Sequence, residues 1–99
     1  MFVSVTTYQA RTGEEDAIIA LHEDWERRRG RSVAHHFSCE LLRSIADPRN
    51  FITLVHYASK ETAQAVIDDF KQDALYSRLV SLIEGDLHCN DYVLEWQVR

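Results

Sequence analysis

Polar and apolar residues alternate in two rhythms along this chain, and each rhythm predicts one type of element. The segment from Phe2 to Ala10 is rich in β-branched and aromatic residues and runs into a turn at Gly13, which predicts a strand. From residue 14 to residue 29 the apolar positions recur every three or four residues, which predicts a helix with one buried face; they are Ile18, Leu21 and Trp25. Acidic residues begin this helix and arginines end it, as the helix dipole favours, and Gly30 fits the position after its end.

The next part of the chain predicts two strands joined by a tight turn. The strands cover about 33–44 and 51–58, and the first of them alternates imperfectly, which indicates a bulge. Between them, Asp47-Pro48-Arg49-Asn50 holds the single proline of the sequence, whose ring presets the backbone for a turn. Ser59 stands just before the following helical segment, so we expect its side chain to cap that helix.

A long helical segment from Lys60 to Glu84 carries two apolar stripes that are slightly rotated against each other. The first stripe consists of Ala63, Val66, Ile67 and Phe70, and the second of Leu75, Leu79, Leu82 and Ile83. Asp73 lies between the stripes, so we expect a kink or two abutting helices there. We expect Gly85 to end the helix and a last strand to run from Leu87 to Val98, with apolar even positions and more polar odd positions.

The resulting order is β-α-β-β-α-β within a single domain spanning residues 1–99. This order predicts an α+β fold, a ferredoxin-like sandwich in which helices cover one face of an antiparallel sheet. A monomer of 99 residues buries only part of its apolar surface, yet 45% of the residues are apolar. Because the other sheet face would stay bare, we expect a homodimer in which two sheets pack face to face.

Net charge and cysteine content argue against several classes of partner. The formal net charge is -5, and basic residues occur singly or in the short patch Arg27–Arg31, so a nucleic-acid partner is not expected. The sequence shows neither an apolar run that could span a bilayer nor a signal peptide, so a membrane partner is not expected either. We therefore expect a cytoplasmic protein in which Cys39 and Cys89 are reduced and packed as small apolar residues.

The histidines and cysteines of the sequence do not form a metal-binding pattern. His35 and His36 are adjacent on a predicted strand and point to opposite faces, as do His88 and Cys89. His35 and Cys39 share a face, but four residues is a long spacing for two ligands of one ion on a strand. The sequence also lacks Cys-x-x-Cys and His-x-x-x-His, so we expect no metal ion.

Several short patterns, spread from Phe2 to Val98, resemble the antibiotic biosynthesis monooxygenase domain. They are Gly-x-x-Asp after the first strand, His-x-x-Trp at His22 and Trp25, Leu-Arg-Ser followed by Asp-Pro and Phe within 42–51, and Tyr57 shortly before Ser-x-Glu-x-Ala. The resemblance implies a dimeric α+β barrel with a ligand cavity between the sheet and the helices of each subunit. It also implies oxygenation of an electron-rich aromatic compound with no metal or flavin cofactor.

The resemblance also implies roles for single positions. The aromatic residue that opens the Trp-x-Ser-x-Glu-x-Ala pattern of the family corresponds to Tyr57, and an asparagine four residues earlier in oxygenating members corresponds to Thr53. A tyrosine near the start of the second helix corresponds to Ala63, and an arginine further along it corresponds to Arg78. Haem-degrading relatives have a strand asparagine that corresponds to Thr6, but their tryptophan and histidine on the second helix have no counterpart here.

Oxygenation without a cofactor needs a deprotonated, electron-rich substrate in a cavity that excludes water. If odd positions of the strand at 51–58 face the helices, Thr53 and Tyr57 point into the cavity and His56 points toward the second subunit. The candidate catalytic residues are Tyr57 as a hydrogen-bond donor to a phenolic oxygen, Arg78 as the holder of an oxyanion, and His22 as the base. The candidate substrate-binding residues are Thr53, Trp25, Tyr76 and Thr6.

Each of these residues also has a purely structural interpretation. Trp25 can pack in the core, His22 can be a partly exposed residue of a helix surface, and Tyr57 can pack against neighbouring strands. The resemblance to the family nevertheless implies a monooxygenase acting on a small aromatic or polyketide-like compound. The alternative is a non-catalytic module for small-molecule binding or signalling on the same scaffold, and haem binding is disfavoured by the missing histidine.

Overall fold

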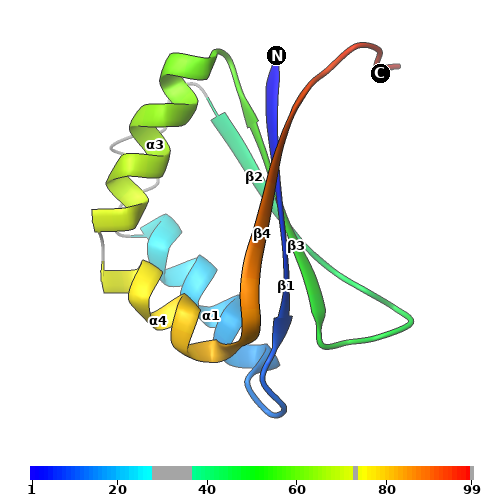
Figure 1. Ribbon diagram of the computed structural model, residues 1–99, viewed down its shortest axis with the longest axis vertical. Coiled ribbons are helices and arrows are strands. Elements are labelled where there is room, and N and C mark those ends of the chain that lie inside the picture. The colour runs from blue at the N-terminus through cyan, green and yellow to red at the C-terminus, as the bar shows by residue number, and fades with distance from the viewer. Residues whose placement is uncertain (28–36, 73, 99) are drawn as a thin grey trace.

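The chain folds into two layers, a four-stranded antiparallel sheet and a layer of helices on one of its faces (Figure 1). The computed structural model describes residues 1–27, 37–72 and 74–98. The strands lie in the order β2-β3-β1-β4 and are β1 (Phe2–Ala10), β2 (Phe37–Arg43), β3 (Asn50–Tyr57) and β4 (Ile83–Val93). The helices of this part of the chain are α1 (Glu15–Trp25), α3 (Lys60–Gln72) and α4 (Ala74–Leu82). The ferredoxin-like α+β sandwich predicted from the sequence is confirmed.

The predicted turn between β2 and β3 and the predicted helix cap at Ser59 are both present. The turn between β2 and β3 is closed by a hydrogen bond from the backbone N–H of Asn50 to the carbonyl of Asp47 at 2.9 Å. The Asp47 carboxylate also accepts a hydrogen bond from the backbone N–H of Arg49 at 3.1 Å. Ahead of α3, the Ser59 hydroxyl accepts a hydrogen bond from the backbone N–H of Thr62 at 3.1 Å, so Ser59 caps the helix.

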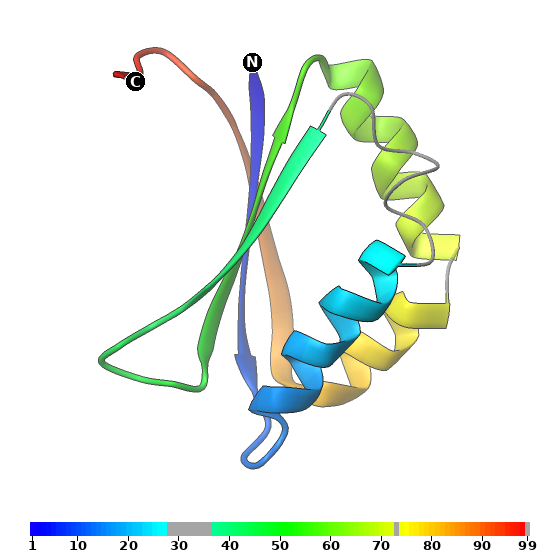
Figure 2. The same ribbon diagram turned by 180° about the vertical axis from the view of Figure 1, so that it is seen from behind.

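The long helical segment forms two helices, which was one of the two alternatives predicted from the sequence, the other being a single kinked helix. α3 ends at Gln72 and α4 begins at Ala74, while Asp73 itself lies outside the described residues. α3 covers one end of the sheet, and α4 lies beside α1 at the other end (Figure 2). The break therefore changes the direction of the chain and lets two helical segments reach different parts of one sheet face.

Some predictions fall on residues that the structure does not describe. These are the helix end at Gly30, most of the arginine patch at 27–31, the beginning of the second strand, and the pair His35 and His36. Within its described range, β2 pairs with β3 from Phe37 to Arg43 without a shift of register. The expected bulge is therefore not found in this part of the strand.

The predicted boundary between the last helix and the last strand is wrong. α4 ends at Leu82, β4 starts at Ile83, and Gly85 lies within the strand instead of ending the helix. Gly85 has φ +80°, a conformation that residues with a side chain rarely adopt. Near this glycine the pairing of β1 with β4 shifts register between Thr7 and Gln9, as at a β-bulge.

The shift of register leaves the faces of the last strand unchanged, because Ala10 pairs with Ile83 on one side of it and Thr6 pairs with Cys89 on the other. The odd positions of β4, which the sequence assigned to a wetter face, turn toward the helices; they are Leu87, Cys89 and Asp91. β4 ends at Val93, before the predicted end at Val98. The apolar even positions beyond it do not form a buried stripe, since Trp96 is 79% exposed.

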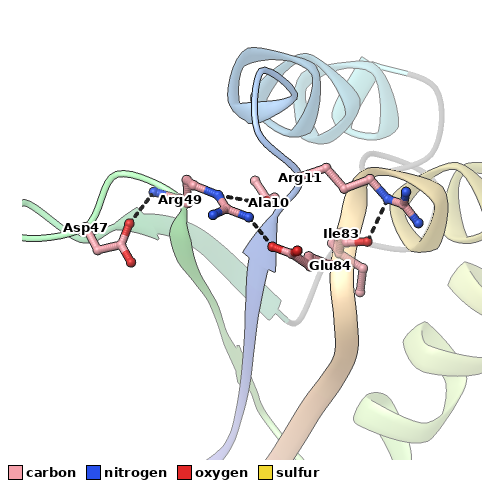
Figure 3. A network of polar contacts seen from close by, with 6 residues as sticks. All are labelled: Ala10, Arg11, Asp47, Arg49, Ile83 and Glu84. Carbon is pink, nitrogen blue, oxygen red and sulfur yellow. Dashed lines mark hydrogen bonds and ion pairs between the residues drawn. The ribbon is translucent and has the colours of Figure 1, made fainter.

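Polar contacts tie three strands together at the end of the sheet where α4 leads into β4 (Figure 3). The Nε of Arg49 donates a hydrogen bond to the carbonyl of Ala10 at 3.0 Å, and the same guanidinium forms an ion pair with Glu84. The Nε of Arg11 donates to the carbonyl of Ile83 at 3.0 Å. These contacts hold the beginnings of β3 and β4 against the end of β1, and so they fix where the odd residues of β4 lie.

The buried apolar side chains form two clusters beneath the helices. The larger cluster consists of Tyr8, Ala10, Ile18, Leu21, Phe51, Leu75, Leu79 and Ile83. The smaller cluster consists of Tyr57, Ala63 and Val66 under α3. Because α1 and α4 cover one end of the sheet and α3 covers the other, the core is divided between two ends instead of filling the whole space between the layers (Figure 1).

The opposite face of the sheet carries none of the described helices (Figure 2). Strand alternation places Val5, Ile52 and Leu54 there as half-buried residues, and Leu42 is 43% exposed. His56 also lies on this face, where its Nε2 is 3.5 Å from Glu40, so its predicted orientation away from the helices is confirmed. No described helix is long and apolar enough to cross a bilayer.

Candidate functional site

A cavity of about 360 Å³ lies between the sheet and the helices. Its wall includes Leu21 and Leu79 of the larger core cluster and Tyr57 and Val66 of the smaller one, so the cavity fills the gap between the two clusters. Pockets for small molecules have volumes of roughly 300–1,000 Å³. This cavity is therefore large enough for a compact aromatic compound.

Aromatic side chains from both layers line the cavity. Tyr8 and Tyr57 come from the sheet, Trp25 comes from α1, and Tyr76 comes from α4. Aliphatic residues such as Ile67 and Leu87 fill the wall between them. Aromatic rings offer large, rigid apolar surfaces with polar tips, so this wall can bind a flat ring and still direct hydrogen bonds at its substituents.

Strand register places the polar side chains of the cavity in two rows across the sheet. In one row Thr53 of β3 pairs with Thr6 of β1, and Thr6 pairs with Cys89 of β4. In the next row Ser4 of β1 lies between Val55 and Asp91. All of these residues line the cavity, because side chains two positions apart on a strand share a face.

The ring of His22 has a defined orientation and tautomer. Its Nδ1 lies 2.8 Å from the carbonyl oxygen of Ile18, one turn earlier on α1, and a carbonyl oxygen can only accept, so Nδ1 carries a proton. In the neutral ring, Nε2 is therefore an unprotonated acceptor, and it lies 3.4 Å from the hydroxyl of Thr53. Burial lowers the pKa of His22 below its ordinary value, so the neutral ring dominates at neutral pH.

The two buried tyrosines of the sheet remain protonated phenols. Burial raises the pKa of Tyr8 to about 12, against a smaller opposing effect of its hydrogen bond to Thr53. Burial also raises the pKa of Tyr57 well above its ordinary value, and nearby acidic groups, including Asp91, raise it further. Both phenols are thus hydrogen-bond donors throughout the physiological pH range.

The structure brings most of the predicted site residues together around this one cavity. Those that line it are His22, Tyr57, Thr53, Trp25, Tyr76 and Thr6. Arg78 is the exception, because it is exposed on α4 and its Nη1 lies 3.7 Å from Asp24 of α1. Arg78 therefore does not reach the place where an oxyanion would form, and the cavity wall contains no lysine or arginine within the described part of the chain.

Sequence reasoning missed several residues of the cavity. Ser4 and Tyr8 share a face with Thr6, so strand alternation alone could have found them. Asp91 was missed because the pattern of the last strand assigned its odd positions to the wetter face, whereas in the structure they line the cavity. Cys39 and Cys89 were expected to be packed in the core, but both are exposed free thiols at the cavity wall.

The thiol of Cys39 is nevertheless unreactive in character. Although the residue as a whole is exposed, its thiol faces the cavity, where burial raises its pKa to about 11. A neighbouring carboxylate, Glu40, raises the pKa further. No group of three or more histidine, cysteine, aspartate or glutamate side chains capable of holding a metal ion occurs among the residues that the structure describes.

Comparison with known proteins gives a result at the level of structure. No family model matches the sequence, and none of the curated proteins does. A solved structure named "Putative antibiotic biosynthesis monooxygenase from Nitrosomonas europaea" superposes with a TM-score of 0.78 at 17% identity, covering 97% of this chain and all of that one. A protein with the same description from Deinococcus radiodurans has a TM-score of 0.81 at 14% identity, covering 100% of this chain and 97% of that one.

A second group of similar structures carries a different family name. A NIPSNAP family protein from Agrobacterium tumefaciens has a TM-score of 0.66 at 19% identity, covering 93% of this chain and 90% of that one. These similarities extend over nearly the whole chain, so they concern the complete domain. The chain therefore has the fold of the antibiotic biosynthesis monooxygenases, as the sequence patterns indicated, and the NIPSNAP proteins share this fold.

Proposed function

We propose that this protein is a cofactor-independent monooxygenase that acts on a small electron-rich aromatic or polyketide-like compound bound in the cavity. One observation carries the proposal: the unprotonated Nε2 of His22 is part of the wall of an aromatic-lined cavity. A neutral imidazole next to an apolar ring is suited to remove a proton from a phenol. The similarity in fold to structures named as antibiotic biosynthesis monooxygenases supports the same class of reaction.

The proposed reaction begins with transfer of a phenolic proton to Nε2 of His22. The phenolate formed is electron-rich enough to reduce O₂. One oxygen atom forms a bond to a ring carbon and the other leaves as water, so a phenol and O₂ give a quinone and water, with all electrons supplied by the substrate. Tyr57 donates a hydrogen bond to the oxygen on which negative charge develops, since its raised pKa keeps it protonated.

The remaining residues of the wall would bind and orient the ring. Trp25 and Tyr76 approach from the helices and offer flat surfaces for stacking. Thr53 and Thr6 lie side by side on the sheet and offer hydroxyl groups to ring substituents. The mainly apolar wall also limits contact of the anion with water, which would otherwise reprotonate it.

The test is oxygen uptake by protein dialysed against a chelator, with a panel of phenols, hydroquinones and naphthols. We expect consumption of one O₂ for each quinone formed, without hydrogen peroxide as a final product. Tight binding of the aromatic compounds without oxygen consumption would contradict the monooxygenase and support the non-catalytic binding module. Titration with haemin tests the haem alternative, for which a shifted Soret band is the diagnostic result.

The binding module has one observation of its own in its favour. The described wall of the cavity provides no cationic side chain for an oxyanion, since Arg78 lies outside it. An enzyme that stabilises a phenolate would benefit from such a charge. In the proposed reaction, the protonated His22 formed in the first step supplies that charge.

We further propose that the protein is a homodimer built on the sheet face that carries no helix. The half-buried Val5, Ile52 and Leu54 and the exposed Leu42 give this face an apolar character that a second copy would cover. Light scattering after size exclusion should give twice the mass of the chain. Leu54→Glu should produce monomers, and a monomeric wild-type protein at micromolar concentration would contradict the proposal.

We also propose that the protein is located in the cytoplasm. Cys39 and Cys89 are both free thiols, and a reducing compartment keeps such thiols from oxidation. Alkylation of the protein under denaturing conditions directly after cell lysis, followed by mass spectrometry, should show both thiols modified. Recovery of either cysteine in a disulfide would argue against this location.

A further inference from the structure

We propose that the cavity prefers aromatic compounds that carry a protonated amine, that Asp91 receives the ammonium group, and that Asp91 discriminates against carboxylates and phosphates. This inference rests on the proposed function, because it names the substrate class of the same cavity. It goes beyond that function, since an electron-rich ring by itself implies no charge preference. It starts from a residue to which the sequence patterns assigned no role.

Asp91 belongs to the cavity because of the way β4 pairs with β1. It lies opposite Ser4, and Ser4 on β1 lies opposite Val55 on β3. All three side chains line the cavity and therefore lie on the helix side of the sheet. β4 is an edge strand and Asp91 is exposed, so its carboxylate stands where the cavity meets solvent.

The charges around the cavity are unbalanced. Within the described wall, Asp91 is the only carboxylate and there is no lysine or arginine. His22 is neutral at neutral pH, because burial lowers its pKa. The ion pairs between described residues involve Asp24, Glu40 and Glu84, and none involves Asp91. A cationic ligand would therefore meet an available negative charge, while an anion would meet repulsion with no compensating cation.

Aromatic groups next to Asp91 also favour a cation. Asp91 and Tyr57 line the same cavity, and the charge of Asp91 is one of the smaller causes that raise the pKa of Tyr57. The faces of aromatic rings attract ammonium groups, and Trp25 and Tyr76 lie in the same cavity. An ammonium group that enters beside Asp91 would thus find a carboxylate and aromatic rings together.

The same arrangement fits the proposed chemistry. Removal of the phenolic proton by His22 creates an oxyanion beside the protonated imidazole, and the described wall has no other cationic side chain. If the ligand carries its own ammonium group, the anion and the ammonium offset each other and the ligand keeps no net charge. A ligand with a carboxylate would instead carry two negative charges near Asp91.

Three probes of equal ring and similar length test the charge preference: tyramine, 4-ethylphenol and 3-(4-hydroxyphenyl)propionate. Binding is measured by calorimetry at pH 7.5 and low salt. We expect tyramine to bind at least about fivefold more tightly than 4-ethylphenol, and the acid to bind most weakly. The advantage of tyramine should shrink as salt is raised, because Asp91 is exposed to screening ions.

Asp91→Asn removes the charge with little change of shape, and Asp86→Asn is the matched control. Asp86 is an exposed residue of the same strand and is not part of the cavity wall. We expect Asp91→Asn to abolish the advantage of tyramine while leaving the affinity for 4-ethylphenol within about twofold, and Asp86→Asn to change neither.

The outcomes separate the inference from the proposed function. Equal binding of the three probes, or a tyramine advantage that survives in Asp91→Asn, would overturn the inference and leave the aromatic cavity intact. Failure of all three probes to bind would overturn both. A thermal unfolding curve of Asp91→Asn that matches the wild type shows that any loss of affinity comes from the missing charge.

Discussion

The hydroxyl of Tyr8 lies 2.8 Å from the hydroxyl of Thr53, and this contact connects two diagonal positions of neighbouring strands. Thr53 pairs directly with Thr6, so the long side chain of Tyr8 reaches across to the next position. Nε2 of neutral His22 can only accept a hydrogen bond, so the Thr53 hydroxyl donates to it. The Tyr8 hydroxyl in turn donates to the Thr53 oxygen. The 3.4 Å separation between Thr53 and His22 makes the bond to His22 the weaker of the two.

Tyr8→Phe should destabilise the protein by about 1 kcal/mol, because Thr53 loses its buried hydrogen-bond partner. Urea denaturation followed by circular dichroism measures this change. Tyr92→Phe is the control, since Tyr92 is 54% exposed, and its substitution should change the free energy of unfolding by less than about 0.5 kcal/mol. An equal effect of both substitutions would show that the Tyr8 hydroxyl makes no specific contribution.

His22→Gln should lower the rate of oxygen consumption by about 10²- to 10⁴-fold, because glutamine can hydrogen-bond but cannot take up the phenolic proton. His88→Gln is the matched control, as His88 is an exposed residue of β4 whose side chain is not part of the cavity wall. Steady-state rates with a hydroquinone measure both variants. A His22→Gln enzyme with wild-type activity would remove His22 from the proposed mechanism.

The lowered pKa of His22 predicts a pH-dependent stability. The unfolded chain has the ordinary histidine pKa of about 6.5 and binds the proton more readily than the folded protein. The contribution of neutral, buried His22 is therefore complete above pH 6.5 and is lost as the pH falls through its folded pKa. Urea denaturation between pH 5 and pH 8 should show this slope in the wild type. His22→Gln should lack this part of the slope, and an unchanged slope in the variant would contradict the assignment.

Arg49→Met should destabilise the protein by about 1–2 kcal/mol, because it removes a hydrogen bond to Ala10 and an ion pair with the partly exposed Glu84. Arg78→Met provides the comparison, since the Arg78 side chain is 57% exposed in its contact with Asp24 and should contribute less than about 0.5 kcal/mol. Thermal unfolding measures both variants. If Arg49→Met were the milder substitution, the contacts of Arg49 with Ala10 and Glu84 would not contribute measurably to stability.

Local patterns predicted a large part of the fold and part of the site. Alternation along β3 placed Thr53 and Tyr57 toward the helices and His56 away from them, because an unbroken strand keeps its phase from one residue to the next. Arg78 was proposed from the resemblance to the family and not from periodicity, and it does not line the cavity. Its position depends on the break between α3 and α4, where the regular rotation of 100° per residue is interrupted.

The prediction for the last strand was also wrong. The sequence indicates that Gly85 interrupts a regular element, but it does not say whether a helix ends there or a strand bends. Gly85 adopts φ +80° inside β4, and the neighbouring shift of register decides which residue of β1 each later residue of β4 lies opposite. Asp91, on which the proposed charge preference depends, therefore lies opposite Ser4 because of a shift of register that no local pattern specifies.

By itself, the sequence determined the order of the elements, the turn at Asp47–Asn50 and the cap at Ser59, because periodicity, turns and caps arise from residues close together in the chain. Only the tertiary structure decided that Tyr8, Thr53 and His22 meet, and that the core divides around a cavity. These features depend on strand register and helix packing between segments far apart in the chain, which no local pattern specifies.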